Sequence, residues 1–542
     1  MKPVWKANGS FTGNAIERGE SIWVQENKTN RENQYGNSKN TEKLDKNTKG
    51  NTVDDKTINN KTLKSSSAQP LPGDITIEAA VIGAGLAGIL TATMLQQKGV
   101  SVAVIECNEV GSGITKNTTA KITSQHGLIY QKLLRYKGEE RAKAYAMANQ
   151  MAVQKYEDMI QQHHIECDFN KLPNYIYTLD NENRIQQEVQ AAKRVGLPAS
   201  FTRETRLPFP VKAAIRFENQ SQFHPIKFID GVASTLTVYE HTKVIEIQKD
   251  GMIITDKGNI KAKSIVITTH YPFINFPGLY FLKLHQEREY LAAIEGCGEN
   301  SFLDGMYLDA DPHGFTFRNH QNYLLLGSGS HRAGKQNPED SYVKIEEAAK
   351  KWYPGSKIKY TWSNQDCMTP DGIPYIGRYS ASTPNLYVAT GFNKWGMTSS
   401  MAAAEIISDM ICKIPNKYEK VFKPNRIMFS GTGFILKDTA ISTINLLSEH
   451  LRIPKDRLNQ IEKGNAGVVI YKGQKYGVYR DLEDNYFFVT TKCPHLGCSL
   501  AWNQNELSWD CPCHGSRFDY KGNLINNPAM RDTFDTCTRK MK

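Results

Sequence analysis

The thirty residues IEAAVIGAGLAGILTATMLQQKGVSVAVIE, at positions 77–106, constrain the fold of this 542-residue chain more than any other segment. An apolar, β-branched run leads into a glycine turn. A helical stretch from Leu86 follows and stops at Gly99, and a second apolar run ends on Glu106. Strands buried on both faces have this composition, and a glycine just past a helix is a common stop signal. The segment therefore predicts a β-α-β unit within a parallel sheet.

The glycine turn of this unit predicts dinucleotide binding. Gly83, Gly85 and Gly88 form the pattern G-x-G-x-x-G between a strand and a helix, and Glu106 ends the next strand. In such a turn the first glycine permits the bend, the second lets backbone N–H groups approach a pyrophosphate, and the third allows close helix packing. The helix N-terminus stabilises the anion, and the acidic residue accepts hydrogen bonds from ribose hydroxyls. An ordinary glycine turn is the alternative, and the pattern alone does not separate FAD from NAD.

Three further segments indicate which dinucleotide is bound. They are the Gly/Ser/Thr-rich loop after Glu106, the strand YEHTKVIEI, and the strand, turn and helix of NLYVATGFNKWGMTSS. In this order they resemble the glycine oxidase / D-amino-acid oxidase superfamily of FAD-dependent oxidoreductases, over about residues 74–430. The resemblance implies an α/β FAD-binding domain, Rossmann-like and of the glutathione-reductase type, interleaved with an α+β substrate domain. Besides the glycine turn and Glu106, it implies FAD contacts at Gly113, Thr118, Thr119, Ala120, Lys121, Val244, Gly391, Gly396 and Met397.

A cluster of cysteines and histidines near the C-terminus predicts a metal site. Cys493 and His495 form C-x-H, and fifteen residues later Cys511 and His514 form C-x-x-H. A structural zinc site could use the same four residue types. The first pair is tighter than zinc sites usually have, however, and each half carries an extra cysteine.

The two halves of this cluster, CPHLGC and CPCHGS, resemble the two boxes of Rieske iron–sulfur proteins. The resemblance implies a small all-β domain with a [2Fe–2S] cluster, in which Cys493 and Cys511 hold one iron and His495 and His514 hold the other. It also implies a disulfide between Cys498 and Cys513. Imidazole ligands place such clusters at about −150 to +300 mV, rather than near −400 mV.

Composition divides the chain into domains. Residues 1–73 form an N-terminal extension that we expect to be largely disordered, because its Asn/Lys/Thr-rich part has almost no large apolar residues. Within it, SIWVQEN is apolar enough to dock on the folded part. We expect the FAD-dependent oxidoreductase at 74–435, a linker helix at 436–455 and the Rieske domain at 456–542.

Charge and hydropathy bear on partners and location. The net charge of +11 is spread along the chain without a basic stripe, which disfavours nucleic acid. No stretch reaches the eighteen or so apolar residues of a membrane span, and the first residues carry no signal-peptide core. We therefore expect a cytoplasmic protein without a transmembrane segment, and peripheral membrane contact stays open.

The two cofactors together predict a redox enzyme. We expect FAD to oxidise a small-molecule substrate, an amine or an amino acid, and the cluster to relay electrons to an unidentified acceptor. One alternative is a reductase or electron-transfer adaptor that feeds a partner. Against NAD(P)H as donor, LLLGSGSHRAGK lacks the G-x-G-x-x-G spacing and is better explained as a hairpin turn. We do not expect a Rieske oxygenase, because none of the 28 residues given after His514 is a histidine that could hold its mononuclear iron.

Catalytic residues are less clearly marked than cofactor residues. His126, in TSQHGLIY, and Lys394, in GFNKWG, are candidates for the flavin side of the site. A hydrogen-bonded structural histidine is the alternative for His126. For Lys394, which could stabilise the reduced flavin anion, the alternative is a solvated turn lysine.

Overall fold

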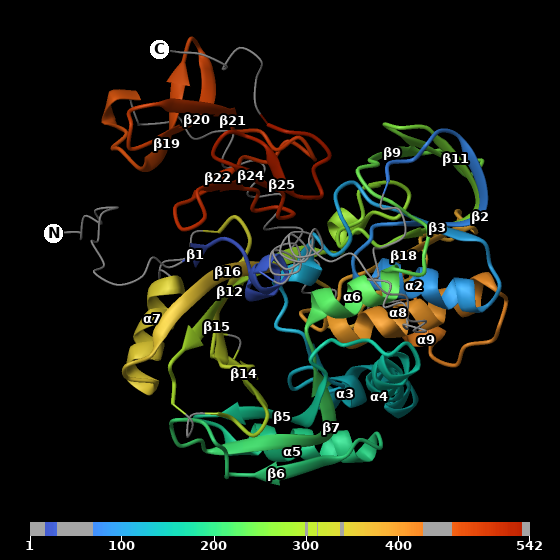
Figure 1. Ribbon diagram of the computed structural model, residues 1–542, viewed down its shortest axis with the longest axis vertical. Coiled ribbons are helices and arrows are strands. Elements are labelled where there is room, and N and C mark those ends of the chain that lie inside the picture. The colour runs from blue at the N-terminus through green and yellow to red at the C-terminus, as the bar shows by residue number, and fades with distance from the viewer. Residues whose placement is uncertain are drawn as a thin grey trace, which may run out of the picture.

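The computed structural model describes residues 17–29, 69–298, 302–311, 313–335, 341–426 and 458–533 (Figure 1). Of the N-terminal extension at 1–73, which we expected to be largely disordered, residues 1–16 and 30–68 lie outside the described residues, as does the predicted linker helix at 436–455.

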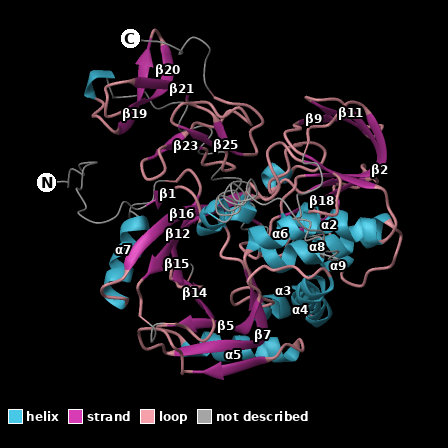
Figure 2. Ribbon diagram, in the orientation of Figure 1, coloured by secondary structure: helices cyan, strands magenta, loops and turns pink. Residues whose placement is uncertain are grey.

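The predicted β-α-β unit forms the centre of an eight-stranded sheet. Its first strand, β2, leads into helix α2, and β3 returns beside β2 in parallel. The last four residues of β2 are buried on both faces, as their apolar composition predicts. Helix α2 packs against α8 under this sheet (Figure 2). The sheet runs in the order β17 (Tyr375–Arg378), β18 (Leu386–Thr390), β11 (Asn259–Ile267), β2 (Ile75–Ile82), β3 (Val102–Ile105) and β8 (Val238–Tyr239), with β10 (Met252–Thr255) and β9 (Val244–Ile247) joined to β11.

The second sheet has ten strands, and all of them except the N-terminal β1 come from chain segments between those of the first sheet. This alternation makes the predicted α/β and α+β domains interleaved. Its strand order is β1 (Glu17–Arg18), β16 (Lys357–Met368), β12 (His285–Glu295), β15 (Tyr323–Arg332), β14 (Thr316–His320), β13 (Met306–Asp309), β5 (Asn170–Thr178), β7 (Ala213–Gln222) and β4 (Lys121–Ile122), with β6 (Ala199–Thr202) on β7.

Helices cover both sheets. Helix α5 packs under β7 and β6, and α7 packs on β15 and β12 (Figure 1). The helices are α2 (Leu86–Gln97), α3 (Tyr130–Lys137), α4 (Glu139–Gln162), α5 (Glu182–Arg194), α6 (Pro225–Ala233), α7 (Ser341–Trp352), α8 (Gly396–Ile411) and α9 (Glu419–Phe422), with short 3-10 turns η1 (Ile114–Asn117), η2 (Tyr280–Leu282) and η4 (Leu458–Gln460).

The segment LLLGSGSHRAGK was expected to form a hairpin turn, and this expectation was wrong. Gly327 and Gly329 lie inside the continuous strand β15. Gly329 has a φ of +78°, and the pairing of β15 with β12 shifts register opposite it, between Arg288 and Tyr290. The second glycine therefore accommodates a β-bulge within the strand.

The C-terminal domain consists of two small antiparallel sheets, drawn in red in Figure 1. It lies against the end of the large sheet formed by β12 and β16. The first sheet contains β19 (Asn465–Tyr471), β20 (Gln474–Arg480) and β21 (Tyr486–Thr490), and the second contains β22 (Ala501–Asn503), β23 (Ser508–Asp510), β24 (Arg517–Asp519) and β25 (Leu524–Asn526).

The apolar N-terminal segment docks on the folded part, as predicted. Ile22 and Trp23 are fully buried, and residues 22–29 are helical. The Trp23 indole donates a hydrogen bond to the carbonyl of Thr118 (2.7 Å), and its ring contacts those of His224 and His320 edge to face. The segment thus supports the loop that follows Glu106 from behind.

Candidate functional site

The glycine turn between β2 and α2 has no room for larger residues. Gly83 has a φ of +105°, and a Cβ at this position would lie 3.0 Å from the carbonyl oxygen of Thr268. A Cβ on Gly88 would lie only 1.9 Å from the carbonyl oxygen of Gly83. Gly85 is extended and precedes the first helical residue. The backbone N–H groups of the turn can therefore approach a pyrophosphate closely.

Glu106 stands at the end of β3 beside this turn. Its carboxylate accepts hydrogen bonds from the backbone N–H of Ala84 (2.8 Å) and of Asn108 (2.8 Å). These bonds fix the side chain at the edge of a cavity. Oε1 also accepts from the Cys107 thiol (3.2 Å), whereas Oε2 keeps a lone pair for a further donor, which is what a ribose hydroxyl supplies.

A cavity of about 500 Å³ runs from this turn to the β12–β16 wall. Nine of the thirteen predicted FAD contacts line it: Gly83, Gly85, Glu106, Gly113, Thr118, Thr119, Val244, Gly396 and Met397. The other four, Gly88, Ala120, Lys121 and Gly391, are not among its lining residues. Gly88 and Gly391 instead permit close packing behind it, since a Cβ on Gly391 would lie 2.4 Å from Thr369. The Lys121 ammonium donates to the carbonyl of Tyr307.

The structure also brings residues to this cavity that the sequence did not indicate. Glu289, Asn364 and Asp366 come from β12 and β16. Residues 524–527, 529, 530 and 532 come from the C-terminal domain. The sequence signal was a continuous run of polar residues in each strand, 285–289 in β12 and 363–366 in β16. Strand register decides which of these residues meet at the cavity.

Two equivalent loops bring the predicted metal ligands together. In one, the Gly497 N–H donates to the carbonyl of Cys493 (2.9 Å), and in the other the Gly515 N–H donates to Cys511 (2.9 Å). The predicted Cys498–Cys513 disulfide joins the loops. The rings of His495 and His514 lie with their centroids 4.9 Å apart, and Cys493 and Cys511 are buried beside them.

The histidine nitrogens fit an iron–sulfur cluster between these loops. His514 donates from Nε2 to the carbonyl of Phe281 (3.1 Å), and His495 Nε2 contacts Asn275 Oδ1 (2.8 Å). A carbonyl can only accept, so the proton lies on Nε2 and Nδ1 keeps its lone pair. Both Nδ1 atoms are buried without a hydrogen-bond partner. Burial lowers the pKa of His495 to about 4 and of His514 to about 3, so both rings are neutral, as metal ligands must be.

The C-terminal domain is fixed on the first domain by hydrogen bonds around the cluster loops. The Gln286 amide donates to the carbonyl of His514 (2.6 Å), and the Gln365 amide donates to Gly515 (2.8 Å). The Asn527 amide donates to the carbonyls of Thr269 and Tyr271 (both 2.8 Å). Thr269 lines the dinucleotide cavity, so this contact links the two sites directly.

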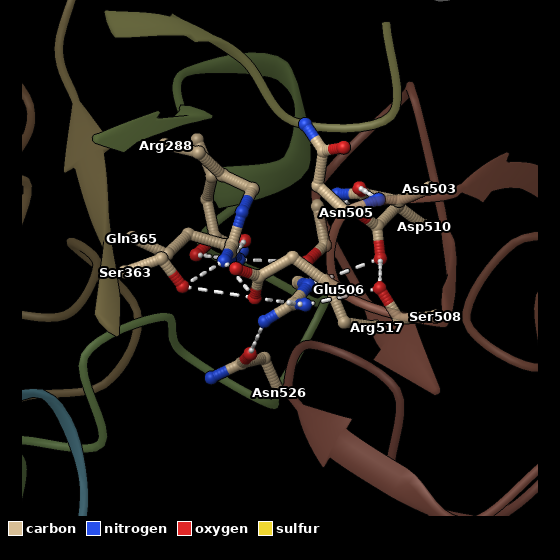
Figure 3. A network of polar contacts seen from close by, with 12 residues as sticks. Arg288, Ser363, Gln365, Asn503, Asn505, Glu506, Ser508, Asp510, Arg517 and Asn526 are labelled. Atoms are coloured by element: carbon tan, nitrogen blue, oxygen red, sulfur yellow. Dashed lines mark hydrogen bonds and ion pairs between the residues drawn. The ribbon is translucent and has the colours of Figure 1, made fainter. Parts of the chain in front are cut away.

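A buried network of charges forms a second part of this interface (Figure 3). Arg288 of β12 contacts the Glu506 carboxylate of the C-terminal domain at 2.6 Å, and Arg517 contacts it at 2.9 Å. Ser363 donates to the same carboxylate (2.9 Å). Burial raises the pKa of Glu506, but Arg288 and Arg517 outweigh it and lower the pKa to about 2. The carboxylate is therefore ionised at neutral pH.

Comparison with known proteins decides the family. The sequence model of the FAD dependent oxidoreductases matches residues 78–410, and that of the Rieske [2Fe-2S] domain matches residues 452–537. The chain belongs to the FAD-dependent oxidoreductase family. It carries a Rieske domain as well, and the two domains imply FAD and a [2Fe–2S] cluster as cofactors.

Relatives and solved structures agree with this assignment. The putative Rieske 2Fe-2S iron-sulfur protein YhfW of Bacillus subtilis (strain 168) is 34% identical, over 85% of this chain and 93% of that protein. Gamma-glutamylputrescine oxidoreductase of Escherichia coli (strain K12) is 22% identical, over 62% of this chain and 84% of that protein. The crystal structure of L-proline dehydrogenase from P. horikoshii shares the fold, with a TM-score of 0.55 at 19% identity, over 66% of this chain and 98% of that one.

The two candidate catalytic residues lie in different surroundings. His126 is buried away from the FAD cavity, with hydrogen-bond contacts to Tyr145 Oη (2.6 Å) and Thr398 Oγ1 (2.9 Å). Burial lowers its pKa to about 3. Lys394 lines the cavity, and its ammonium lies 3.2 Å from the Glu287 carboxylate. Of the two, only Lys394 can touch a bound flavin or substrate.

Across the described residues, no helix is both long and apolar enough to cross a membrane.

Proposed function

We propose that this chain oxidises an amine or an amino acid at FAD and passes the electrons to its Rieske cluster and on to an external acceptor. The proposal assigns the oxidation to residues 74–435 and the relay to residues 456–542. One observation carries it: the Rieske domain supplies residues 524–532 to the wall of the FAD cavity. The two cofactor sites therefore share a boundary.

The cofactors supply the redox chemistry: FAD accepts two electrons from a substrate, and a Rieske cluster carries one electron at a time. The chain's own residues bind and position them. The N–H groups at Gly83 and Gly85 would hold the pyrophosphate, and Glu106 the ribose. Cys493 and Cys511 would hold one iron, and His495 and His514 the other.

The segment between the sites supports electron transfer inside the chain. Tyr271 is fully buried, and its ring faces both ligand histidines, with centroid distances of 6.3 Å to His495 and 6.5 Å to His514. The neighbouring residues Thr269, His270 and Phe273 line the FAD cavity. Asn527 holds this segment through two carbonyls. A fully buried aromatic side chain, on a segment held by hydrogen bonds, therefore lies next to both sites.

An anaerobic mixing experiment tests the proposal. The purified holoprotein is mixed separately with a panel of amines and amino acids, and with NADH and NADPH. Flavin absorbance reports reduction at the first site, and the EPR signal of the reduced cluster reports arrival at the second. We expect an amine or amino acid to bleach the flavin and the cluster signal to follow. Reduction by a nicotinamide alone would contradict the proposed amine or amino-acid donor and would favour a reductase that feeds a partner.

A cysteine variant separates the two sites. In Cys511→Ser the substrate should still bleach the flavin, and the Rieske EPR signal should be absent, because one proposed iron ligand is lost. Cys412→Ser removes a thiol that lies outside both sites and should behave as the wild type. If Cys511→Ser keeps the Rieske signal, the ligand assignment is wrong.

A further inference from the structure

The wall of the FAD cavity formed by β12 and β16 carries carboxylates. In this antiparallel pair Glu287 lies opposite Asp366, and Glu289 lies opposite Asn364. Residues directly opposite each other, and alternate residues along one strand, point to the same face of a sheet. Glu289, Asn364 and Asp366 all line the cavity. This acidic wall, defined by these three residues, therefore faces the bound cofactor and any substrate.

Lysines supply the positive charge near this wall. Lys394 lines the cavity, and its ammonium pairs with Glu287 at 3.2 Å and also attracts Glu289 and Asp366. Lys243 lines the cavity too, and its ammonium donates to the carbonyl of Met530 (2.7 Å). The Lys121 ammonium lies behind the wall, and burial lowers its pKa to about 7. Among the described residues that line the cavity, none is an arginine. A ligand carboxylate would therefore meet two acidic side chains and no guanidinium to pair with.

An unpartnered amide oxygen marks the wall as a binding surface. Asn364 is only 8% exposed, and its amide nitrogen donates to the Asp366 carboxylate at 3.1 Å. Its Oδ1 atom is buried and has no hydrogen-bond partner. A buried polar atom without a partner is costly unless a ligand or water satisfies it. The donors missing here are N–H groups, because each of these side chains presents acceptor oxygens.

The anionic part of FAD is not expected at this wall, because its pyrophosphate belongs at the N-terminus of α2. Burial raises the pKa of Asp366 to about 7, with Lys394 only partly opposing this. A positively charged ligand beside this carboxyl group would add to the attraction of Lys394 and favour the ionised form.

We infer that the acidic wall of Glu289, Asn364 and Asp366 binds the amino group of a substrate amine that carries no carboxylate next to it. This inference rests on the proposed function and narrows its substrate class from amines or amino acids to amines. The charged amino group donates to Asn364 Oδ1 and pairs with the carboxylates. An α-carboxylate on the same carbon would be brought toward like charges, so amino acids bind poorly.

Binding to the oxidised holoprotein tests the inference without turnover. The probes are butylamine, norvaline (butylamine with a carboxylate on C1), 1,4-diaminobutane and the uncharged 1-butanol. Titration calorimetry and the shift of the flavin spectrum each give a Kd. We expect both amines to bind at least about tenfold more tightly than norvaline or 1-butanol. Norvaline binding as tightly as butylamine, or neither amine binding at millimolar concentration, would overturn the inference.

Three variants locate the effect. Glu289→Gln and Asp366→Asn should each weaken butylamine binding by about tenfold or more, the range of a lost charge-assisted hydrogen bond. Neither substitution should weaken the binding of norvaline. Glu295→Gln lies on the same strand outside the cavity and should leave both Kd values unchanged. FAD content and thermal unfolding are measured for each variant to show that it is folded. If both cavity variants fold and both bind butylamine as tightly as the wild type, the assignment is wrong. If Asp366→Asn does not fold, Glu289→Gln alone decides the test in the same way.

The failures of the two proposals are distinguishable. If butylamine binds as expected and never reduces the flavin, the acidic wall stands and the proposed oxidation fails. If norvaline reduces the flavin and the cluster signal follows, the proposed function stands and this substrate class is wrong.

Discussion

Removing the charge of Glu506 should weaken the attachment of the Rieske domain. The side chain of Arg288 is 1% exposed and that of Glu506 is 14% exposed, so solvent screens their 2.6 Å contact little. Breaking a buried ion pair from one side costs about 3–5 kcal/mol, because the remaining charge stays buried. The pKa of Glu506 gives a similar figure: a fall from 4.5 to about 2 corresponds to roughly 3 kcal/mol. We expect Glu506→Gln to lose about 3 kcal/mol of unfolding free energy.

Urea denaturation of the holoprotein, followed by the visible circular dichroism of the cluster, measures this loss. Asp484→Asn is the matched control, because its carboxylate, with a side chain 46% exposed, pairs with Arg480 and Lys463 at the surface. We expect no measurable change there. A double-mutant cycle with Arg288→Met isolates the pairwise energy. If Glu506→Gln unfolds at the same urea concentration as the wild type, the buried network does not hold the domains together.

The same carboxylate gives a pH dependence with a defined sign. Its pKa in the folded protein is below the ordinary value of 4.5, so the unfolded state binds the proton more readily. Its contribution to stability is complete above about pH 4.5 and is lost as the pH falls toward 2. In Glu506→Gln, the free energy of unfolding should decrease less steeply as the pH falls over this range. An equally steep fall in that variant would assign acid unfolding to other groups.

Three further perturbations test other parts of the structure. Asn275→Leu removes the acceptor for the His495 Nε2–H. Because less electron density then reaches the iron, we expect an EPR-monitored redox titration to show a higher reduction potential of the cluster. An unchanged reduction potential would contradict this role of Asn275. Because the pKa of Asp366 is raised in the folded protein, this group lowers the free energy of unfolding as the pH rises from about 4 to 7. Asp366→Asn should remove this pH-dependent loss and raise the free energy of unfolding at pH 7 by at most about 4 kcal/mol, as measured by urea denaturation. Trp23→Ala should lower stability by about 3–5 kcal/mol and weaken FAD retention in gel filtration, whereas an effect on stability alone would show that Trp23 does not support the FAD loop.

The sequence alone determined the features that depend on short spacings. The glycine turn was predictable because Gly83 and Gly88 occupy positions where a Cβ would collide with backbone, whatever the rest of the chain does. The pairs Cys493/His495 and Cys511/His514 were predictable because each lies within one tight loop. The disulfide between Cys498 and Cys513 followed from the resemblance of these loops to Rieske boxes. The β-α-β unit at 77–106 indicated a parallel sheet, and the rest of the fold class followed from the resemblance to the oxidoreductase superfamily.

Only the tertiary structure decided how the two domains meet and what the cavity presents to a substrate. Glu289 and Asp366 are 77 residues apart in the chain and reach one wall through the register of β12 with β16. Asn275 and Phe281 meet the histidine ligands, and residues 524–532 close the FAD cavity, because the Rieske domain docks in one orientation. Long-range register and docking depend on the summed packing and charge pairing of many residues. No local pattern encodes such a sum, so these contacts became visible only in the folded chain.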